Sequence, residues 1–405
     1  MHNLNSKLPT NIVITSILFA LFANIKFINQ IVLVALPSLS GGFMASMYGV
    51  MVPILFIVGI FFQKRSLLEL SRSHITISFM CLMWYLATMM FIATPSVPFA
   101  FFGVFTLAAF LIPGLIRIDV RTFLLVLMIT SSVGVFYVDR IIINSIMEEG
   151  VLSMGICYSM LVPVIANLIY IRYFFLQEKR LMKIALLPIT AINIFYLVQM
   201  TMFGSRGPVF CVTLLLFCLI ILKVSDDNQV TIRKGYATIG IILVILVALY
   251  FVPLLKAISG YLEGYDISLN VVDKFLRLDN MSGDLSNGRD AIDIIAWDGI
   301  FESPFLGYGT AQFENNTGFV YPHNFILQFL YDGGLLLTFV VLFPIVRTVI
   351  QKIKKVNSQE YICLIFLFFC SVPGSLLSGD LWEAGMLWMF FGFVLSRNSY
   401  YKLQL

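Results

Sequence analysis

Long apolar runs, separated by short polar breaks, make up most of this chain of 405 residues. A helix needs roughly 17–25 apolar residues to cross the hydrocarbon core of a bilayer, which is about 30 Å thick. The first run is longer than this and contains Lys26, so we expect it to be tilted, kinked or broken in two. The pattern predicts an all-α polytopic membrane protein with about twelve transmembrane helices. The predicted helices lie at 11–36, 42–62, 75–93, 99–116, 122–138, 155–176, 184–203, 208–223, 236–258, 324–350, 360–377 and 384–397.

The composition agrees with a membrane protein and excludes several classes of function. Hydrophobic residues make up 60% of the chain and charged residues 12%, whereas a soluble domain has about 25% charged residues. The sequence has no Walker motif, no GxGxxG fingerprint and no HExxH motif, so ATP, dinucleotide and zinc-protease functions have no support. The six cysteines all lie in apolar runs without metal-ligand spacing. We therefore expect no cofactor and no metal.

The basic residues predict the orientation in the membrane. With a cytoplasmic N-terminus, most of the 26 Lys and Arg residues fall in cytoplasmic loops, as the positive-inside rule requires. Both termini are therefore predicted to be cytoplasmic. The net charge of +4 reflects this topology, and no nucleic-acid partner is expected. The basic residues left outside are Arg140, Arg206, Lys256, Lys274, Arg277 and Arg289.

One outer loop is much longer than the others and divides the chain into three parts. Residues 1–258 hold predicted helices one to nine, residues 259–322 form the loop, and residues 323–405 hold the last three helices. The loop contains too many aromatic residues for a disordered linker, and residues 289–299 have apolar positions at helical spacing. We predict that the loop is a small folded cap over a cavity among the helices.

Two outer arginines are candidate anion ligands. Arg206 lies in a Gly-Ser-Arg-Gly break between two apolar runs, and Arg289 opens a predicted helix. A guanidinium is a planar donor suited to phosphate, and a helix N-terminus favours anions. The structural alternatives are an Arg206 that snorkels to the membrane interface and an ion pair of Arg289 with Asp290 or Asp293.

His323 is the candidate general base. It follows Pro322, a residue that favours the first turn of a helix. The locally positive start of a helix keeps imidazole neutral, which is the form a base requires. An interfacial histidine bonded to a loop carbonyl is the alternative. Polar residues continue along one face of the same helix, so this face should line a cavity or the bundle interior: Asn324, Gln328, Tyr331 and Asp332.

Other outer polar residues are candidates for substrate contact. Asn324 and Tyr321 flank His323, and Gly333-Gly334 is expected to be a site of close packing or bending. No DxD motif occurs on the outer side, which argues against a metal-dependent nucleotide-sugar transferase. The carboxylates that could act as a base or contact sugar are Asp284, Glu302, Glu314, Asp380 and Glu383.

The motifs together resemble those of a known superfamily. The series Arg289, Trp297, Ser303-Pro304-x-x-Gly307-x-Gly309, His323-Asn324 and Gly333-Gly334 resembles the large periplasmic loop of the O-antigen polymerase and ligase superfamily (Wzy and WaaL types). The Gly-Ser-Arg-Gly break is similar to a motif that precedes a helix in that family. The resemblance implies a GT-C-like membrane glycosyltransferase of the bacterial inner membrane, with a periplasmic active site. It also implies metal-free, inverting transfer from a glycan carried on undecaprenyl pyrophosphate.

The resemblance assigns roles to the candidate residues. Arg206 and Arg289 would bind the pyrophosphate, and His323 would activate the acceptor hydroxyl. Leu337 stands where a ligase-type motif has Gly, Thr or Tyr, which favours a polymerase whose donor and acceptor are both lipid-linked oligosaccharides. A chain-length regulator is a candidate partner. An O-antigen ligase that transfers glycan to the lipid A core is the alternative, and a flippase without bond chemistry is a third.

Overall fold

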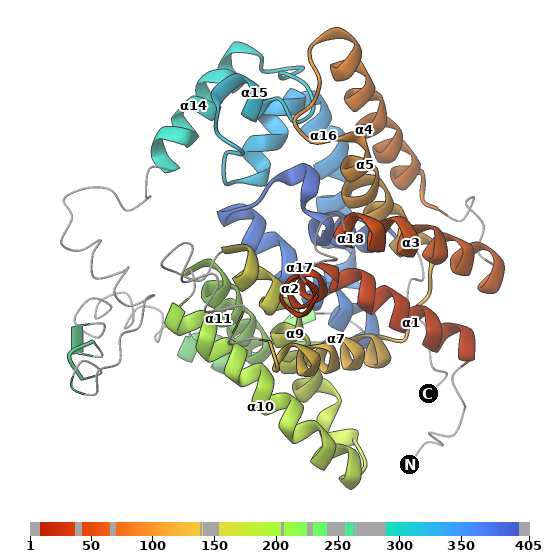
Figure 1. Cartoon of the computed structure of the whole chain (residues 1–405), viewed down its shortest axis with the longest axis vertical. Coiled ribbons are helices and arrows are strands. Elements are labelled where there is room, and N and C mark those ends of the chain that lie inside the picture. The colour runs from red at the N-terminus through yellow and green to blue at the C-terminus, as the bar shows by residue number, and fades with distance from the viewer. Residues whose placement is uncertain are drawn as a thin grey trace. The chain divides into compact units, whose positions relative to one another are not determined.

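The computed structural model describes residues 9–36, 43–64, 70–137, 140, 154–203, 206–224, 230–240, 256–257, 259–261, 264 and 289–396 (Figure 1). Most of the first half of the large loop, including Asp284, lies outside the described residues. The elements are α1 (Thr10–Ala23), α2 (Ile25–Ala35), α3 (Phe43–Ile57), η2 (Val58–Phe62), α4 (Arg72–Phe91), α5 (Phe99–Phe101), η4 (Phe102–Ala108), α6 (Ala109–Leu115), α7 (Val120–Gly134), α9 (Met154–Tyr173), η5 (Phe175–Gln177), α10 (Arg180–Phe203), α11 (Arg206–Ile221), β1 (Leu222–Val224), β2 (Val230–Ile232), α14 (Arg289–Glu302), α15 (Phe313–Thr317), α16 (Phe325–Lys354), α17 (Ser358–Leu377), η6 (Leu381–Glu383) and α18 (Gly385–Leu395).

The helices confirm an all-α membrane protein. Within the described residues, 5 helices are long and apolar enough to cross a membrane, namely α4, α9, α10, α16 and α17, and the pair α1–α2 would make a sixth span. The over-long first run is broken at Asn24, as the sequence predicts. Shorter apolar helices occupy most other predicted runs, whereas the run 236–258 lies largely outside the described residues. The count of about twelve spans and the GT-C likeness stay predictions.

The chain forms two compact units, which are described separately. Unit 1 contains Met1–Ile25, Gly42–Val126 and Gly288–Leu405, and unit 2 contains Lys26–Gly41 and Leu127–Asn287. The functional division into two groups of helices and a loop stays a prediction.

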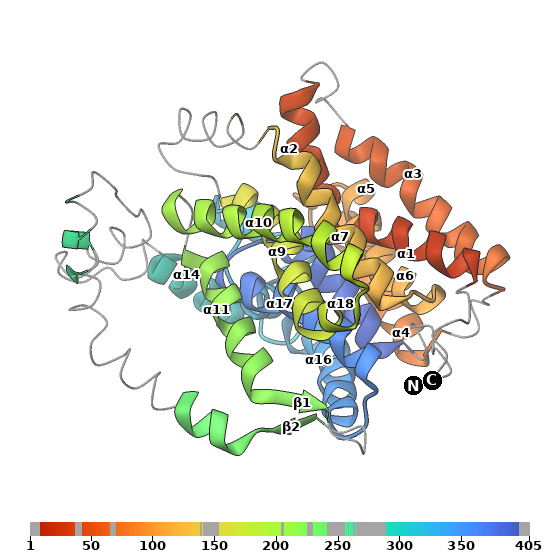
Figure 2. The same cartoon turned by 90° about the horizontal axis from the view of Figure 1, so that it is seen from below.

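Unit 2 is built around α9, against which α10 and α11 pack. The Tyr196 hydroxyl donates to the carbonyl of Ser131 (2.5 Å), and the Asn193 side chain donates to the Ser131 hydroxyl (3.0 Å), so polar contacts tie α10 to α7. At the end of α11 the chain forms the antiparallel pair β1–β2, which the sequence does not predict (Figure 2). Strands of three residues are too short to give a reliable alternating pattern.

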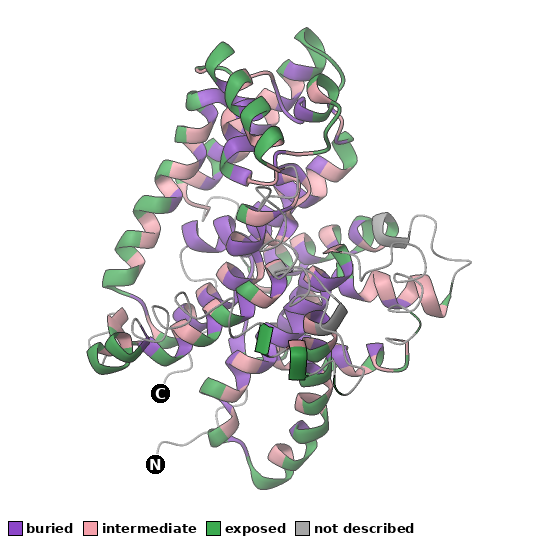
Figure 3. Ribbon diagram, turned by 90° about the vertical axis from the view of Figure 1, so that its left-hand side faces the viewer, coloured by how far each residue is buried: buried purple, intermediate pink, exposed green. Residues whose placement is uncertain are grey.

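Unit 1 has α18 at its core. Every residue of α18 except Met386 is buried, and buried residues are purple in Figure 3. The helix packs closely against α6 because Gly392 has no side chain: a Cβ at this position would lie 2.0 Å from the carbonyl oxygen of Phe110. Before α18, the rings of Trp382 and Trp388 stack with centroids 6.1 Å apart. This packing gives the segment that contains η6 a rigid support.

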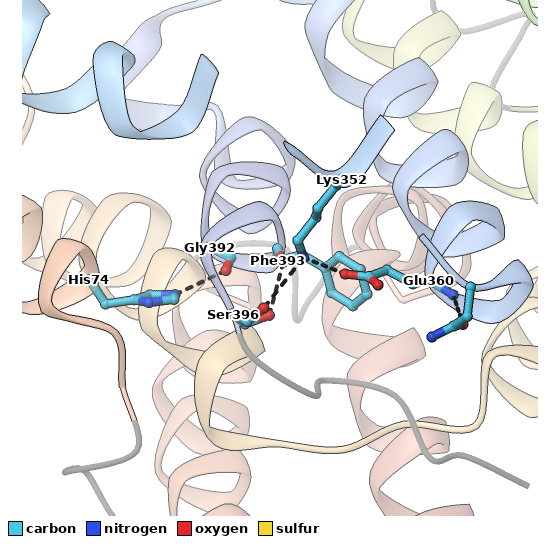
Figure 4. Close-up of polar contacts among 7 residues, drawn as sticks. His74, Lys352, Glu360, Gly392, Phe393 and Ser396 are labelled. Carbon is cyan, nitrogen blue, oxygen red and sulfur yellow. Dashed lines mark hydrogen bonds and ion pairs between the residues drawn. The ribbon is translucent and has the colours of Figure 1, made fainter. Parts of the chain in front are cut away.

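A polar network joins the ends of α16, α17 and α18 (Figure 4). The Lys352 ammonium lies 2.5 Å from a carboxylate oxygen of Glu360 and also donates to the carbonyls of Phe393 and Ser396 (3.4 and 3.3 Å). These carbonyls belong to the C-terminal end of α18, where a cation is favourable. Nearby, His74 Nε2 lies 2.9 Å from the carbonyl oxygen of Gly392. The network therefore fixes the three helices at the end opposite His323.

Candidate functional site

Helix α16 is broken at Gly334. This residue has φ +57° and ψ −166°, which is not a helical conformation. A Cβ at Gly334 would lie 2.4 Å from the carbonyl carbon of Phe305, so the absent side chain lets another segment approach the helix backbone. The expectation that Gly333-Gly334 is a site of close packing or bending is confirmed.

Residues 303–312, which we call the return segment, enter this break. Backbone groups freed by the break bond to the return segment, and further backbone bonds join it to the turn just before the break. This pairing satisfies polar groups that a broken helix would otherwise leave without partners. The bonds are Leu335 N to Pro304 O (2.8 Å), Leu336 N to Phe305 O (3.2 Å), Tyr308 N to Tyr331 O (2.9 Å) and Gly309 N to Asp332 O (2.8 Å).

Asp332 fixes the far end of the return segment. Its carboxylate is fully buried and accepts bonds from the amides of Ala311 (3.2 Å) and Gln312 (3.3 Å). It also accepts a 2.6 Å bond from the indole of Trp382 in η6. Gln328, Tyr331 and Asp332 are all buried, which confirms that the polar stripe on α16 faces the protein interior. One carboxylate thus connects the cap to the segment before α18.

The predicted amphipathic helix in the loop is also present, as α14. Ala296 and Ile300 are buried in a cluster with Phe313, Leu327 and Tyr331, so α14 and α15 pack on α16. This arrangement is visible at the top of Figure 1. We use the term cap for residues 289–324. That the cap covers a cavity stays a prediction.

The start of α16 differs from the prediction. The helix begins at Phe325, and Asn324 is its N-cap, with Oδ1 accepting from the amide of Ile326 (2.9 Å). Pro322 and His323 therefore precede the helix and are not in its first turn. The reason is that Asn is a strong N-cap residue, and its side chain satisfies a free amide of the first turn. Asn324 thus has a structural role, whether or not it also contacts substrate.

His323 is held in an unusual environment. It has φ +54°, a conformation uncommon for a residue with a side chain. Its ring is partly buried and contacts Tyr321 edge to face, with centroids 4.7 Å apart, and Nδ1 is buried without a hydrogen-bond partner among the described residues. Burial, and then the positive charge of Arg289, lowers the pKa of His323. The ring is therefore neutral near pH 7 and offers a nitrogen that no described protein group uses.

Arg289 lies at the same place. It opens α14, and Nη1 donates to the carbonyl of Leu377 at the end of α17 (2.8 Å). The next residue, Ser378, has its hydroxyl 3.3 Å from that of Tyr321. A guanidinium has five N–H donors, so one bond to a helix C-terminus is compatible with a second role in binding an anion. The structure thus brings Arg289, Tyr321 and His323 together at the end of α17.

A carboxylate that the sequence placed only among several candidates is near the same helix end. Asp380 accepts from the amide of Trp382 (2.7 Å) and from the Gln328 side chain (3.1 Å), and the Gln328 oxygen accepts from Leu381 N (2.7 Å). Burial raises the pKa of Asp380 to about 6. The sequence feature that could have singled out Asp380 is its position in a short Ser-Gly-Asp stretch between two apolar runs. This stretch lies at the same predicted membrane face as His323.

The other candidates lie elsewhere or cannot be placed. Glu302 is exposed and accepts a 2.5 Å bond from the Tyr308 hydroxyl, and this bond and burial raise the pKa of Tyr308 to about 12. Glu314 is exposed on α15. Arg206 is the first residue of α11 in unit 2, but its side chain lies outside the described residues, as does Asp284.

A family model described as O-antigen ligase matches residues 191–342. Over these residues the chain is similar to the O-antigen polymerase and ligase superfamily. The matched region contains Arg206, Arg289 and His323, together with the break at Gly334. The match does not separate polymerase from ligase activity. No curated protein and no solved structure matches the chain.

Proposed function

We propose that this protein is a glycosyltransferase that polymerises O-antigen repeat units carried on undecaprenyl pyrophosphate, at the periplasmic face of the bacterial inner membrane. The observation that carries the proposal is the environment of His323. A partly buried, neutral imidazole, whose Nδ1 has no partner among the described residues, lies within electrostatic range of Arg289. A neutral base beside an anion-binding group is what transfer from a lipid pyrophosphate requires.

The proposed reaction is a single displacement that inverts the anomeric centre. The acceptor hydroxyl loses its proton to the imidazole of His323 as its oxygen attacks the anomeric carbon. The bond from that carbon to the pyrophosphate breaks, and undecaprenyl pyrophosphate leaves with the electron pair. Arg289, with Arg206, stabilises the negative charge that develops on the leaving group. No metal takes part in the proposed step.

Asp380 and Tyr321 are proposed contacts to the acceptor sugar. Both lie near the end of α17, and the hydrogen bond from Gln328 holds the Asp380 carboxylate in place. A carboxylate oxygen can accept a further bond from a sugar hydroxyl, since each oxygen has two lone pairs. Glu302, Glu314 and Asp284 remain candidates for contacts to more distant sugar units.

A ligase that transfers finished glycan to the lipid A core is the second candidate, because the matching family model is described as O-antigen ligase. Leu337, buried on α16, stands where the ligase-type motif has Gly, Thr or Tyr. This departure favours the polymerase. A chain-length regulator is a partner that only the polymerase would need.

The lipopolysaccharide pattern on a gel separates the two activities. Deletion of the gene for a polymerase should leave lipid A core that carries one repeat unit, whereas deletion of a ligase should leave bare core. Complementation with the wild-type chain should restore the full ladder, and His323→Gln should not. Bare core in the deletion strain would contradict the polymerase and support the ligase.

The orientation is tested separately with reporter fusions. A reporter fused near Asn316, in the cap, should be active only when it is exported. Fusions after each terminus should be active only in the cytoplasm. A fusion near Asn316 that is active in the cytoplasm would overturn the proposed location of the site.

A further inference from the structure

Exposed apolar side chains on α16 form a continuous stripe only after the break at Gly334. Between Phe325 and Gly334, Ile326 is the one exposed residue, because the cap and neighbouring helices cover this part of α16. From Leu335 onward, exposed apolar residues recur every three or four positions and so share one face of the helix. They are Leu335, Leu336, Phe339, Phe343, Val346, Ile350 and Ile353.

The length of this stripe matches the thickness of a membrane. Residues 335–354 rise about 30 Å at 1.5 Å per residue, which equals the usual hydrocarbon thickness. Lys354 is exposed in the last turn, where its charged side chain can reach the opposite interface. A span over residues 335–354 would place the break at Gly334 at the edge of the hydrocarbon core, with the first ten residues of α16 beyond it.

The cap presents its own exposed apolar side chains at the level of this edge. Phe305 and Leu306 are 70% and 58% exposed, and the backbone bonds to Leu335 and Leu336 hold them beside the start of the stripe. The cap surface and the lipid-facing stripe are therefore continuous. Phospholipid is the partner expected for the adjoining face of α16, because this helix is long and apolar enough to cross a membrane.

Helix α14 extends the same surface. Ile294, Trp297 and Phe301 are exposed on one face, and the rings of Trp297 and Phe301 stack with centroids 6.0 Å apart. The exposed carboxylates Asp298 and Glu302 lie on the adjacent polar side. Trp is enriched at membrane interfaces.

We infer that Ile294, Trp297, Phe301, Phe305 and Leu306, which we name the apolar belt, insert into the headgroup and acyl boundary of the membrane leaflet nearest the cap. The cap is then anchored to lipid along its outer side, and α14 lies on the membrane. A lipid-linked substrate in this leaflet would meet the cap at the level of the headgroups. The inference concerns membrane contact alone and does not depend on the transfer chemistry.

Quenching of tryptophan fluorescence tests this inference with the full chain in phospholipid nanodiscs. The contribution of Trp297 is the difference between the wild-type protein and Trp297→Phe. Phospholipids brominated near the headgroup should quench this contribution more than phospholipids brominated near the chain end, because interfacial helices lie about 5–10 Å deep. Iodide in the aqueous phase should have little effect on it.

A matched control moves the indole by one residue. The double variant Trp297→Phe with Asp298→Trp keeps the number of tryptophans and rotates the probe by about 100° around α14. This indole should be quenched by iodide more than by brominated lipid. If Trp297 is instead quenched by iodide and not by brominated lipid, the cap stands in water and the inference is wrong. Protection from both quenchers would mean that a second protein surface covers the belt, which would also overturn it.

Discussion

The backbone of Phe305 occupies the space that a side chain would need at Gly334. A Cβ at Gly334 would lie 2.4 Å from both the carbonyl carbon and the carbonyl oxygen of Phe305. The φ of +57° at Gly334 is also unfavourable for any residue with a side chain. Position 334 therefore requires glycine for two independent reasons, one steric and one conformational.

Gly334→Ala should displace the return segment from α16. The left-handed conformation alone costs about 1–3 kcal/mol, and the contact with Phe305 adds to it. We expect a lower thermal unfolding temperature in detergent and loss of polymer in a complementation assay. Gly49→Ala is the matched control, because Gly49 lies in α3, where an added Cβ would have no atom within 4 Å. Equal stability of the two variants would show that the return segment does not depend on the break.

His323→Gln should abolish chain extension while the protein still folds and inserts. Glutamine keeps hydrogen bonding but has no basicity, and general base catalysis contributes about 10²–10⁴-fold. Purified variant would be given lipid-pyrophosphate repeat units, and the products sized on a gel in the presence of chelator. Normal elongation by His323→Gln would remove this residue from proton transfer.

Added imidazole should partly restore activity to His323→Ala, because a free base can enter the space of the lost ring. A purely structural role of His323 would give no rescue.

Loss of wild-type activity with chelator would contradict the metal-free step.

Arg289→Lys and Arg206→Lys should each lower activity sharply, because lysine keeps the charge but loses the planar set of donors that binds phosphate. In Arg289→Lys the bond to the Leu377 carbonyl should weaken as well, since it uses Nη1. The rate of transfer in purified protein is the measurement. A full lipopolysaccharide ladder with both variants would show that neither position needs the planar donors of arginine. The two residues would then contribute only positive charge or a structural contact.

The acid limb of the pH profile should lie below the ordinary imidazole pKa of about 6.5. Burial lowers the pKa of His323, so the ring stays neutral and active until the pH falls below that value. Asp380 titrates nearby, with its pKa raised to about 6. Initial rates would be measured between about pH 5 and 8. In Asp380→Asn the acid limb should persist if His323 causes it, and its disappearance would assign the limb to Asp380.

Lys352→Ala should destabilise the protein without touching the proposed site. It leaves the Glu360 carboxylate without its 2.5 Å partner, and removing one member of a largely buried pair costs on the order of 3 kcal/mol. Lys354→Ala is the control, because Lys354 is exposed on the same turn. Thermal unfolding in detergent would compare them, and equal midpoints would show that the network in Figure 4 adds no stability.

The sequence predicts the helices well because apolar length is a local property. An irregularity in the over-long first run and a helix in the loop can both be predicted from spacing and composition, whereas the position of the break at Asn24 cannot. The sequence places the start of α16 too early because Pro322 and Asn324 are both helix-start signals, and only Asn324 caps the helix. Local signals of similar strength cannot be ranked without the tertiary contacts.

The parts that could not be predicted depend on contacts between distant residues. Gly333-Gly334 suggests a bend, but nothing in the pattern shows that residues 303–312 fill it. The grouping of Asp380 with Gln328 joins residues 52 positions apart, and hydropathy carries no information about such a pair. His323 and Arg289 are both candidates from the sequence, but their proximity at the end of α17 is a result of the fold.

The pairing of the return segment with α16 also sets an order of assembly. Pro304 and Phe305 are synthesised before Leu335 and Leu336, so the partners of their carbonyls do not exist until α16 has been made. The N–H groups of Leu335 and Leu336 bond to these carbonyls and not to their own helix, and an unpaired group in hydrocarbon costs several kcal/mol. We therefore expect the integration of α16 into the bilayer to require docking of the earlier segment. The backbone hydrogen bonds at Leu335 and Leu336 are thus made with residues that are synthesised before α16 itself.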